Sequence, residues 1–408
     1  MSTLLNLSDI RQPRRNTFLV FGAPAIGEAE IQEVVDTLRS GWLGTGPRCE
    51  RFEESFRQYI GCRHAIALNS CTAGLELALE AAGVGPGDEV ITTPLTFCAT
   101  ANVIVHRGAT PVFVDVERET GNIDPERVAR AVTSRTKAIL PVHLYGRPCR
   151  MNELLEIARR RGLYVIEDAA HATEAWYRGR KVGNIGDATV FSFYVTKNMT
   201  TGEGGMVTTN HDTWAEEMGV KKLHGLSRDA WKRYSEDGFQ PYDVLAAGYK
   251  FNMTDLQAAL GVHQLARLEE NFKIRQRYWA MYEEAFQRMP EMVIPRAPFE
   301  DELSGDRHAR HLFTVLVNPE LPGMSRWEFI NALKAANIGT GIHFLALHLH
   351  SYYRERFGHR PGDFPNAEYI AARTVSLPLS VSMSDEDIRD VISAVKRAAQ
   401  RKASAAKV

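Results

Sequence analysis

The chain has 408 residues, more than the roughly 150 of an ordinary domain, which predicts two domains. Its 49 Lys and Arg residues against 50 Asp and Glu leave a net charge of −1, without the basic surplus that binding to nucleic acid or to an anionic membrane requires. With 44% hydrophobic and 24% charged residues, the composition excludes a disordered or fibrous chain. We therefore expect no nucleic acid and no membrane among its partners.

The five cysteines are odd in number, and none of them forms a Cys-x-x-Cys pair. This pattern argues against a disulfide framework and against a structural zinc site. The first residues lack the basic start and apolar run of an export signal, and no segment reaches the ~18 consecutive apolar residues of a membrane helix. We expect the protein to work in the reducing cytoplasm.

From about residue 62, short β-branched runs alternate with amphipathic helical runs, which is typical of a parallel sheet covered by helices. The predicted fold class is therefore α/β. Seven strands are predicted at 64–68, 89–92, 111–116, 138–143, 164–167, 189–193 and 206–209. Helices between them are predicted at 74–82, 125–132 and 152–160.

A long helical pattern over 258–288 predicts one helix that connects the two domains. A Pro-rich, charged segment at 290–310 is followed by a predicted strand at 312–317 and predicted helices at 326–335 and 385–399. The small and basic residues 401–408 are predicted to fray. This organisation divides the chain into a large domain, residues 15–265, and a smaller C-terminal α/β domain, residues 266–400.

Two charged residues are candidates for cofactor chemistry. Asp168 follows the predicted strand 164–167, at the edge of the sheet where open α/β proteins bind ligands, although an aspartate there also suits a helix cap. Lys197 lies between a buried-looking strand and the Gly-rich turn 202–205, which allows close approach to a planar ligand. Most lysines are solvated surface charges, whereas a Schiff-base lysine needs such a partly desolvated cleft. Because an aspartate keeps a pyridine nitrogen protonated, the two residues together suit a pyridine cofactor.

Three further features lie at or near strand ends. The turn Asn-Ser-Cys-Thr-Ala-Gly at 69–74 precedes a helix, so its backbone N–H groups suit a phosphate, or its Ser and Thr a simple cap. Phe97 can lay its ring on a flat cofactor or pack in the core. Ser192 lies near the end of the predicted strand 189–193, before Lys197, and is a further candidate phosphate ligand. Together with Asp168, these groups are the equipment for pyridoxal phosphate.

With these residues in this order, the chain resembles the DegT/StrS family of aminotransferases, fold-type-I pyridoxal phosphate enzymes that act on nucleotide-linked keto sugars. The resemblance covers about residues 20–400. Its most specific motifs are GWLGTGP at 41–47, NSCTAG at 69–74, EDAAHA at 167–172, SFYVTKNMTTGEGG at 192–205, GYKFNMTD at 248–255 and GIHF at 341–344. It implies a mostly parallel seven-stranded sheet in the large domain, a smaller C-terminal α/β domain, and a homodimer with shared active sites.

The resemblance also implies a role for each matched residue. Lys197 corresponds to the lysine that links the cofactor, Asp168 to the partner of its pyridine nitrogen, and His171 to the group near its 3-hydroxyl; these three form the catalytic set. The other implied cofactor residues are Thr72, Ala73 and Ser192 at the phosphate and Phe97 on the ring. Lys250 and Asn252 are implied to reach the phosphate of the neighbouring subunit's site. Many members carry Asn at the position of Lys250 and Gln at the position of His171.

For the reaction, the resemblance implies a transaminase that takes an amino group from an amino acid, glutamate in most relatives, and gives it to a keto sugar. The product would serve amino-sugar or cell-surface glycan biosynthesis, lipopolysaccharide included. The overall similarity favours a UDP-linked 4-keto sugar as the acceptor. Trp42 and His343 are candidate contacts for this substrate.

Four other functions fit the sequence less well. A nicotinamide enzyme needs Gly-x-Gly-x-x-Gly between a strand and a helix, whereas GVGPG at 83–87 lies after a helix and before a strand. A metal site at His343, His348 and His350 lacks a supporting carboxylate or Cys spacing. Sugar dehydratases of the same fold replace the lysine by His, so Lys197 favours aminotransfer. A non-enzymatic regulatory or binding protein would not need Asp168 and Lys197 together.

Overall fold

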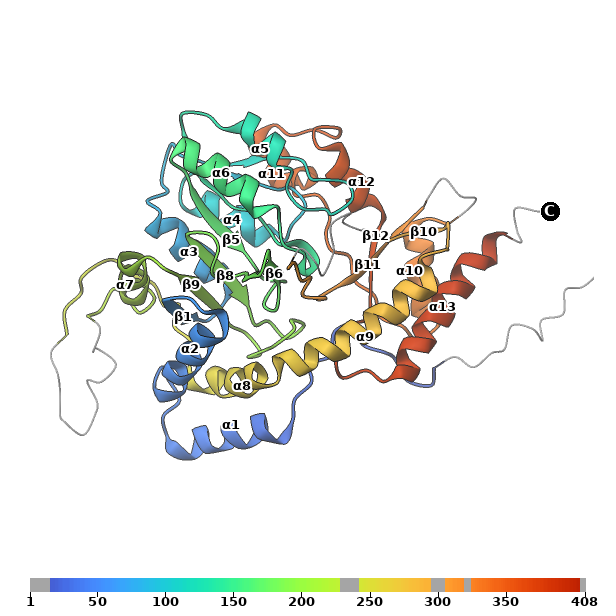
Figure 1. Ribbon diagram of the computed structural model, residues 1–408, viewed down its shortest axis with the longest axis horizontal. Coiled ribbons are helices and arrows are strands. Elements are labelled where there is room, and N and C mark those ends of the chain that lie inside the picture. Colours follow the sequence, from blue (N-terminus) through green and yellow to red (C-terminus); the bar gives the residue numbers. More distant parts are fainter. Residues whose placement is uncertain (1–14, 228–241, 295–304, 319–323, 404–408) are drawn as a thin grey trace, which may run out of the picture.

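The computed structural model describes residues 15–227, 242–294, 305–318 and 324–403. A large sheet is covered by helices on both faces, and α9 (Leu268–Phe286) runs from it to a smaller sheet (Figure 1). Part of the Pro-rich segment 290–310 and the last residues of the predicted frayed tail lie outside the described residues. The predicted α/β class is confirmed.

The large sheet has seven strands in the order β1-β9-β8-β5-β4-β2-β3. Strand β9 is antiparallel to both of its neighbours, and the other pairs are parallel. The strands are β1 (His64–Leu68), β2 (Glu89–Thr92), β3 (Thr110–Phe113), β4 (Thr136–Ile139), β5 (Tyr164–Asp168), β8 (Ala188–Ser192) and β9 (Gly205–Thr209). All seven predicted strands are present. Their register places Asp168 opposite Val190, so the ends of β5 and β8 lie side by side.

Strands β3 and β4 end earlier than the predicted 111–116 and 138–143. Pro141 has no N–H for a further ladder bond, which stops β4. After β3, the carboxylate of Asp115 accepts hydrogen bonds at 2.9 and 3.0 Å from two backbone N–H groups at the start of α12 (Pro365–Arg373). After β4 the chain stays beside β5, where Val142 bridges Asp168, whereas after β3 it turns to α12, which the β-branched pattern does not reveal.

Helices cover both faces of the large sheet (Figure 1). One face carries α2 (Pro47–Ile60), α5 (Pro125–Ala131), α6 (Met151–Arg161) and α8 (Asp255–Ala266), and the other carries α3 (Cys71–Ala81), α4 (Cys98–His106) and α7 (Asp212–Lys221). Phe191 belongs to the apolar cluster on the first face and its neighbour Val190 to the cluster on the second. Successive side chains of a strand point to opposite faces, so a strand buried on both sides must be apolar throughout.

The predicted single helix over 258–288 is wrong. The structure has two helices, α8 and α9, separated at Arg267, whose φ of −107° and ψ of 9° leave the helical range. The guanidinium of Arg267 donates to the carbonyl of Ala25 and to Glu30, which ties this break between the helices to the N-terminal segment. Helix α8 also begins earlier than predicted, because Thr254 opens it with a capping box.

We call the described residues from Leu268 to Ala403 the C-terminal unit; they include a second, antiparallel sheet in the order β10-β11-β12. Its strands and main helices are β10 (Met292–Val293), β11 (Phe313–Val317), β12 (Thr374–Leu377), α10 (Arg326–Ala335) and α13 (Asp385–Ala403), and its core includes Tyr282, Phe286, Phe313 and Phe329. The predicted strand at 312–317 and helices at 326–335 and 385–399 are confirmed. Residues 401–403 are helical rather than frayed, because Arg, Lys and Ala all favour helix.

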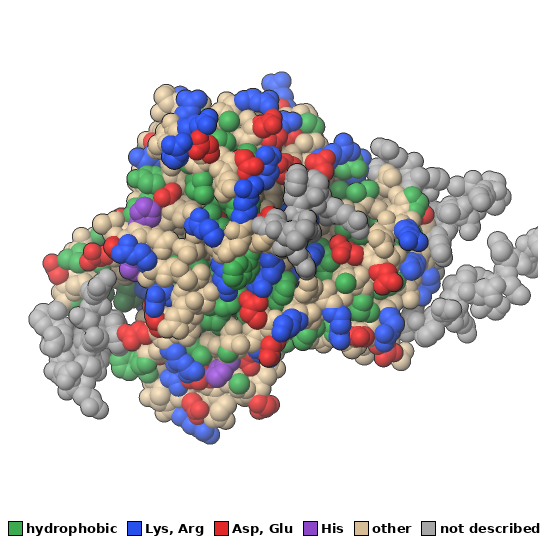
Figure 2. Space-filling model, viewed as in Figure 1, with side chains coloured by type: hydrophobic (Ala, Val, Ile, Leu, Met, Phe, Trp, Pro, Cys, Tyr) green, Lys and Arg blue, Asp and Glu red, His purple; other side chains and the backbone are tan. Residues whose placement is uncertain are grey.

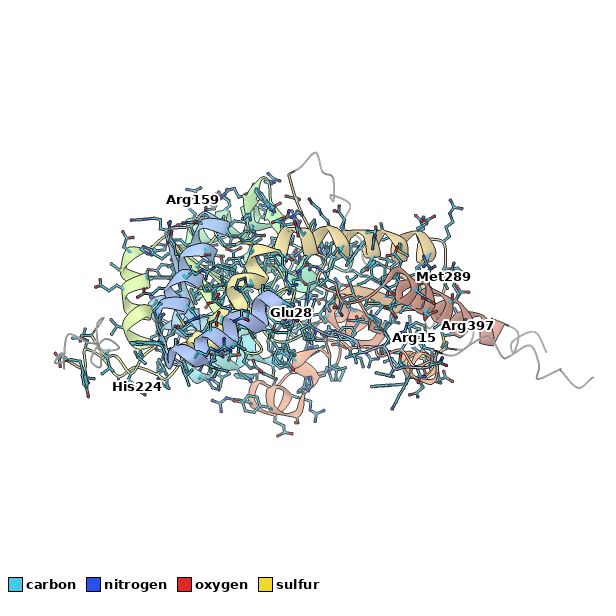
Figure 3. All side chains as sticks on the ribbon, turned by 90° about the horizontal axis from the view of Figure 1, so that it is seen from below. Arg15, Glu28, Arg159, His224, Met289 and Arg397 are labelled. Atoms are coloured by element: carbon cyan, nitrogen blue, oxygen red, sulfur yellow. The ribbon has the colours of Figure 1, made fainter. Side chains whose placement is uncertain are left out.

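The N-terminal segment lies against this C-terminal unit. Leu19 pairs with Ile338, and Arg15 donates to Asp390 at 2.9 Å. Figure 3 shows Arg15 and Arg397 at the same end of the molecule. The predicted domain division at residue 265 stays a prediction. The remaining elements are α1 (Glu28–Ser40), β6 (Trp176–Tyr177), β7 (Arg180–Lys181) and α11 (Ser351–Phe357).

Acidic and basic side chains are interspersed over the face of the molecule in Figure 2, in keeping with the net charge of −1. In the described parts of the chain, no helix combines the length and the apolar character needed to cross a membrane. All five cysteines are free thiols.

Gly74 sits where α3 packs closely on the sheet. A Cβ atom there would lie 2.5 Å from a methyl carbon of Val190 and 2.9 Å from one of Val207. We predict that Gly74→Ala lowers the free energy of unfolding by about 1–3 kcal/mol, because the helix must move away from the sheet.

Gly219 in α7 is a matched control, since a Cβ atom there meets no atom within 4 Å. Gly219→Ala should raise the free energy of unfolding by about 0.5–1 kcal/mol, because alanine favours the helix. Urea denaturation followed by circular dichroism measures both variants. Equal effects of the two substitutions would contradict the close packing of α3.

Candidate active site

A cleft of about 490 Å³ opens at the edge of the large sheet where β5 and β8 end. Open α/β sheets bind ligands at this edge, and the volume is typical of a cofactor site. Its walls come from the first turns of α3 and α4, the ends of β5 and β8, the turn after β8, and the C-terminal unit. The predicted site residues that line it are Thr72, Phe97, Asp168, His171, Ser192, Lys197 and His343.

Asp168, the last residue of β5, is buried in the wall of this cleft. Thr100 donates its hydroxyl to one carboxylate oxygen at 2.8 Å, and the backbone N–H of Ala170 donates to the other at 3.1 Å. Burial raises the pKa of the Asp168 carboxyl, while the two donors and the charge of Lys197 oppose this rise. A cationic group of a ligand beside Asp168 would therefore stabilise the ionised carboxylate.

Lys197 lies in the turn that follows β8 and lines the same cleft. Its backbone N–H donates to the carbonyl of Tyr194 at 2.9 Å, which closes the turn. Burial lowers the pKa of the Lys197 ammonium group to about 8, against the opposing influence of Cys71 and Asp168. An amine with this pKa is neutral in a sizeable fraction near neutral pH, so it can act as a nucleophile and as a proton carrier.

The ring of His171 is held as a neutral imidazole. The backbone N–H of Tyr145 donates to its Nδ1 at 3.2 Å, so the ring proton sits on Nε2. Burial lowers the pKa of His171 well below its usual value, and the charge of Lys197 lowers it further. The ring is stacked on Phe344, with ring centres 5.8 Å apart and planes inclined by 14°. His171 can therefore donate a hydrogen bond from Nε2 without carrying a charge.

One end of the cleft is formed by the start of α3. Ser70 is the N-cap: its hydroxyl accepts from the N–H of Ala73 at 3.1 Å, and this cap starts the helix at Cys71, three residues before the predicted start. The cap occupies the N–H of Ala73, and Ala73 does not line the cleft. Thr72 and the buried Ser192 do line it. Their hydroxyl groups can face an anion at this end.

Phe97 and His343 reach the cleft from different units. Phe97 precedes α4 and is 60% exposed, so it is not packed in the core and its ring is available to stack on a planar ligand. His343, in the C-terminal unit, has Nδ1 2.8 Å from the hydroxyl of Ser376 and its ring stacked on Phe21. Burial lowers the pKa of His343 to about 4, so this ring is neutral near pH 7.

Three further predicted residues lie outside the lining of the cleft. Trp42 donates its indole N–H to the carbonyl of Thr45 at 3.0 Å, and Asn252 donates to the Thr45 hydroxyl at 2.7 Å. Lys250 is exposed, and its carbonyl accepts from the side chain of Asn69 at 3.1 Å. Within one chain these residues therefore do not line the cleft. The implied roles of Lys250 and Asn252 toward a neighbouring subunit, and of Trp42 as a substrate contact, stay predictions.

The three histidines weighed for a metal site do not converge. Nδ1 of His343 pairs with Ser376, Nε2 of His348 pairs with Glu368 at 2.9 Å, and His350 is exposed. Among the residues that the structure describes, no group of three or more His, Cys, Asp or Glu side chains is arranged to hold a metal ion.

Sequence reasoning missed residues that shape the cleft. Thr100 lies in the first turn of α4, after Phe97, and a hydroxyl so close to a predicted ligand-binding turn was a usable signal for a partner of Asp168. Tyr145 offered no such signal, because it acts through its backbone N–H. Its φ of 60° is rare for a bulky residue and places that N–H on the ring of His171.

The residues of the cleft fit pyridoxal phosphate. Asp168 suits its ring nitrogen, Lys197 its aldehyde and Phe97 its flat face. At the end near α3, a Cβ atom at Gly205 would lie 2.5 Å from the backbone nitrogen of Cys71, so only glycine lets β9 pass this close to the turn. The donor set matches a phosphorylated pyridine aldehyde, and the close passage of β9 fixes the turn at the phosphate end.

Comparisons with known proteins agree with this chemistry. The model of the DegT/DnrJ/EryC1/StrS aminotransferase family matches residues 24–396. The spore coat polysaccharide biosynthesis protein SpsC of Bacillus subtilis is 52% identical over 384 residues, which are 94% of this chain and 97% of SpsC.

Two solved structures are similar to this chain in sequence and in fold. Spr1654 of Streptococcus pneumoniae, a candidate sugar aminotransferase solved in its PLP form, is 33% identical with a TM-score of 0.85, over 94% of this chain and 99% of that one. DesI, solved in the presence of its TDP-sugar product, is 34% identical with a TM-score of 0.82, over 94% and 93% of the two chains.

We predict that Lys197 forms the covalent link to pyridoxal phosphate, at a rate that rises with pH. The neutral amine attacks the aldehyde, and it predominates above the Lys197 pKa of about 8. Rapid mixing of cofactor-free protein with pyridoxal phosphate should show a rate that rises through about pH 8 and then levels off. Borohydride reduction and peptide mapping should find the label on Lys197.

Lys181 is the matched control. Burial also lowers its pKa to about 8, but it lies over the ring of Tyr59 and does not line the cleft. Lys181→Ala should therefore leave the linkage intact, whereas Lys197→Ala should abolish it. A label on another lysine, or a rate that does not change with pH, would show that the assignment is wrong.

Proposed function

Since the chain belongs to the DegT/DnrJ/EryC1/StrS aminotransferase family and is a pyridoxal phosphate-dependent aminotransferase, we propose that it moves an amino group from L-glutamate to a nucleotide-linked 4-keto sugar, and that the nucleotide is UDP. The observation that carries the proposal is the single cleft that Lys197, Asp168 and Phe97 all line. An amine, a buried carboxylate and an exposed aromatic ring are the groups that this cofactor takes from its protein.

Each group in the cleft has a role that follows from its chemistry. When bound, pyridoxal phosphate supplies an aldehyde that carries the amino group and a ring that withdraws electrons. The carboxylate of Asp168 would hold the protonated ring nitrogen, and Nε2 of His171 would donate to the ring oxygen. The amine of Lys197 would give way to the amino acid and then carry protons at the reacting carbon, for which a pKa of about 8 is well suited.

The phosphate is assigned to the start of α3 and the end of β8. Thr72 and Ser192 supply hydroxyl groups there. The backbone N–H of Ala73 joins them once the hydroxyl of Ser70, which accepts from it in this structure, turns away. A helix N-terminus favours an anion, because its first N–H groups point outward and carry partial positive charge.

The acceptor is inferred from two relatives and from the open side of the cleft. DesI is described with a TDP-sugar product, and SpsC is described as a protein of spore coat polysaccharide biosynthesis. Opposite the start of α3, the cleft is lined by Tyr194, His343 and Phe344, whose rings suit a sugar and its nucleotide. A role in amino-sugar or cell-surface glycan biosynthesis, in the cytoplasm, follows from this proposal.

The active unit is proposed to be a homodimer with shared sites. Trp42, Lys250 and Asn252 belong to motifs that the family resemblance places at the active site, yet in one chain they lie outside the cleft. A neighbouring subunit that brings them to the cleft reconciles the two observations. Lys250 and Asn252 would then serve the phosphate of the partner's cofactor, and Trp42 the sugar substrate.

We predict that, after L-glutamate has converted the bound cofactor to its amino form, UDP-linked 4-keto sugars restore the original absorption spectrum. Simple 2-keto acids other than the one derived from glutamate should not restore this spectrum, because they offer no nucleotide to bind. The same nucleotide sugar without its keto group is the control and should cause no change. Faster recovery with simple 2-keto acids than with any keto sugar nucleotide would refute the sugar assignment.

We predict that Lys197→Ala and Asn252→Ala subunits, each inactive alone, regain activity when mixed. In the mixed dimer, one site combines the intact Lys197 of one subunit with the intact Asn252 of the other. Lys197→Ala mixed with Asp168→Asn is the control and should stay inactive, since both residues belong to the cleft of one subunit. Subunit exchange is verified by mass spectrometry, and exchange without recovery would count against shared sites.

A further inference from the structure

Asn198, the residue after Lys197, connects the lysine turn to the C-terminal unit. Its amide nitrogen donates to the carboxylate of Glu174 at 2.8 Å and to the carbonyl of Ala309 at 3.0 Å. Both partners only accept, so the orientation of the amide is set and its oxygen faces His311. Nδ1 of His311 lies 2.8 Å from that oxygen, and therefore carries the ring proton and donates it.

Glu174 gives this amide a firm anchor. It is completely buried and forms an ion pair with Arg275 of α9, which is itself 2% exposed. Burial raises the pKa of Glu174, and Arg275 and Asn198 oppose the rise. A buried ion pair is costly to disturb, because either charge left alone in the interior is strongly unfavourable. The position of Asn198 is thus tied to α9 as well as to the sheet.

His311 in turn supports His171. The two ring centres are 4.5 Å apart and the planes are inclined by 39°. His171 has its proton on Nε2, since Tyr145 donates to its Nδ1, whereas His311 has its proton on Nδ1. Both rings are buried, and burial lowers both pKa values well below the usual range. The pair therefore stays neutral, with two set tautomers.

We propose that Asn198 and His311 are a positioning pair that holds the turn of Lys197 and the ring of His171 in place across the boundary between the large sheet and the C-terminal unit. Neither residue lines the cleft, so both act through these neighbours. A displacement of about 1 Å in a catalytic group can lower a rate by about a hundredfold. The inference rests on the proposed role of Lys197 as the cofactor-linked lysine.

Several titratable or charged groups lie near Lys197 and can influence the pH titration of the lysine–cofactor linkage. They are Cys71 and Asp168, the three histidines His171, His311 and His343, Glu203 in the lining of the cleft, and Arg275 in the small adjoining cavity. All of these groups are unchanged in Asn198→Ala. A change in the titration of the lysine–cofactor linkage in that variant therefore reports on positions and not on a lost charge.

Asn198→Ala and His311→Phe both remove the hydrogen bond between the two residues, and phenylalanine keeps a ring against His171. Asn198→Ala also removes the hydrogen bonds to Glu174 and Ala309, so it should be the worse single variant. In the holoenzyme, each variant should lower kcat by about tenfold to a hundredfold and leave KM for L-glutamate within about twofold. Each should also shift the pH midpoint of the absorption of the resting lysine–cofactor linkage by at least about 0.5 unit, in the same direction. The double variant should lose no more than the worse single variant, because the interaction is counted once.

Asn184→Ala is the matched control. Its amide also donates to a carbonyl, that of Gly61 at 2.9 Å, and accepts from Asn210 at 2.7 Å, but it lies outside the lining of the cleft. This variant should change neither kcat nor the midpoint. If Asn198→Ala fails to fold, His311→Phe decides the outcome through the same midpoint.

The positioning pair would be overturned if the losses in kcat multiplied in the double variant. It would also be overturned if the pH midpoint stayed within about 0.1 unit of the wild-type value in both single variants. Borohydride labelling of the wild-type holoenzyme separates this failure from a failure of the proposed function. A wild-type enzyme without label on Lys197 overturns the proposed function and the pair with it. Label on Lys197 together with an unchanged midpoint overturns the pair alone.

Discussion

The carboxylate of Asp168 and the amine of Lys197 share one buried cleft, and their opposite responses to burial set its chemistry. Burial raises the pKa of the carboxyl group and lowers that of the ammonium group, so both charges are costly in the cleft. In the proposed arrangement, a pyridine ring would offer Asp168 a cation, and an aldehyde would take up the amine of Lys197 in a covalent bond. The cofactor would then relieve two desolvation costs at once, and its binding should stabilise the fold.

The sheet topology brings Asp168 and Lys197 to the same cleft. Asp168 ends β5, and the register with β8 brings the chain that leads to Lys197 alongside it. Strand β9 then returns antiparallel between β1 and β8, so the lysine turn is anchored in the sheet at both of its ends. The C-terminal unit closes the remaining side through His343 and Phe344. The cleft is thus lined by both parts of the chain, with Asp168 and Lys197 on the large sheet and the turn that follows it.

Much of the sheet and part of the site were predictable, because they depend on local pattern. Buried strands are continuous β-branched runs, and ligand-binding groups follow strand ends in open α/β sheets. The prediction failed at Arg267, where the helical pattern continues but contacts with the N-terminal segment break the helix. It also missed Tyr145, because a backbone N–H leaves no mark in the choice of side chain. The cap of Ser70 on Ala73 is one of the two readings that the sequence left open for this turn, and the phosphate reading stays a prediction.

The close passage of Gly205 beneath the start of α3 divides the cleft into a part that can vary and a part that cannot. There the main chain of β9 lies against the main chain of the turn before α3, at a spacing that leaves no room for a methyl group at Gly205. This packing fixes the position of the turn that carries Thr72, so we expect this end to be inherited unchanged however the acceptor changes. The opposite side is made of side chains, Tyr194, His343 and Phe344, each replaceable by a single codon change. New acceptors can therefore be selected on that side without disturbing the grip on the cofactor.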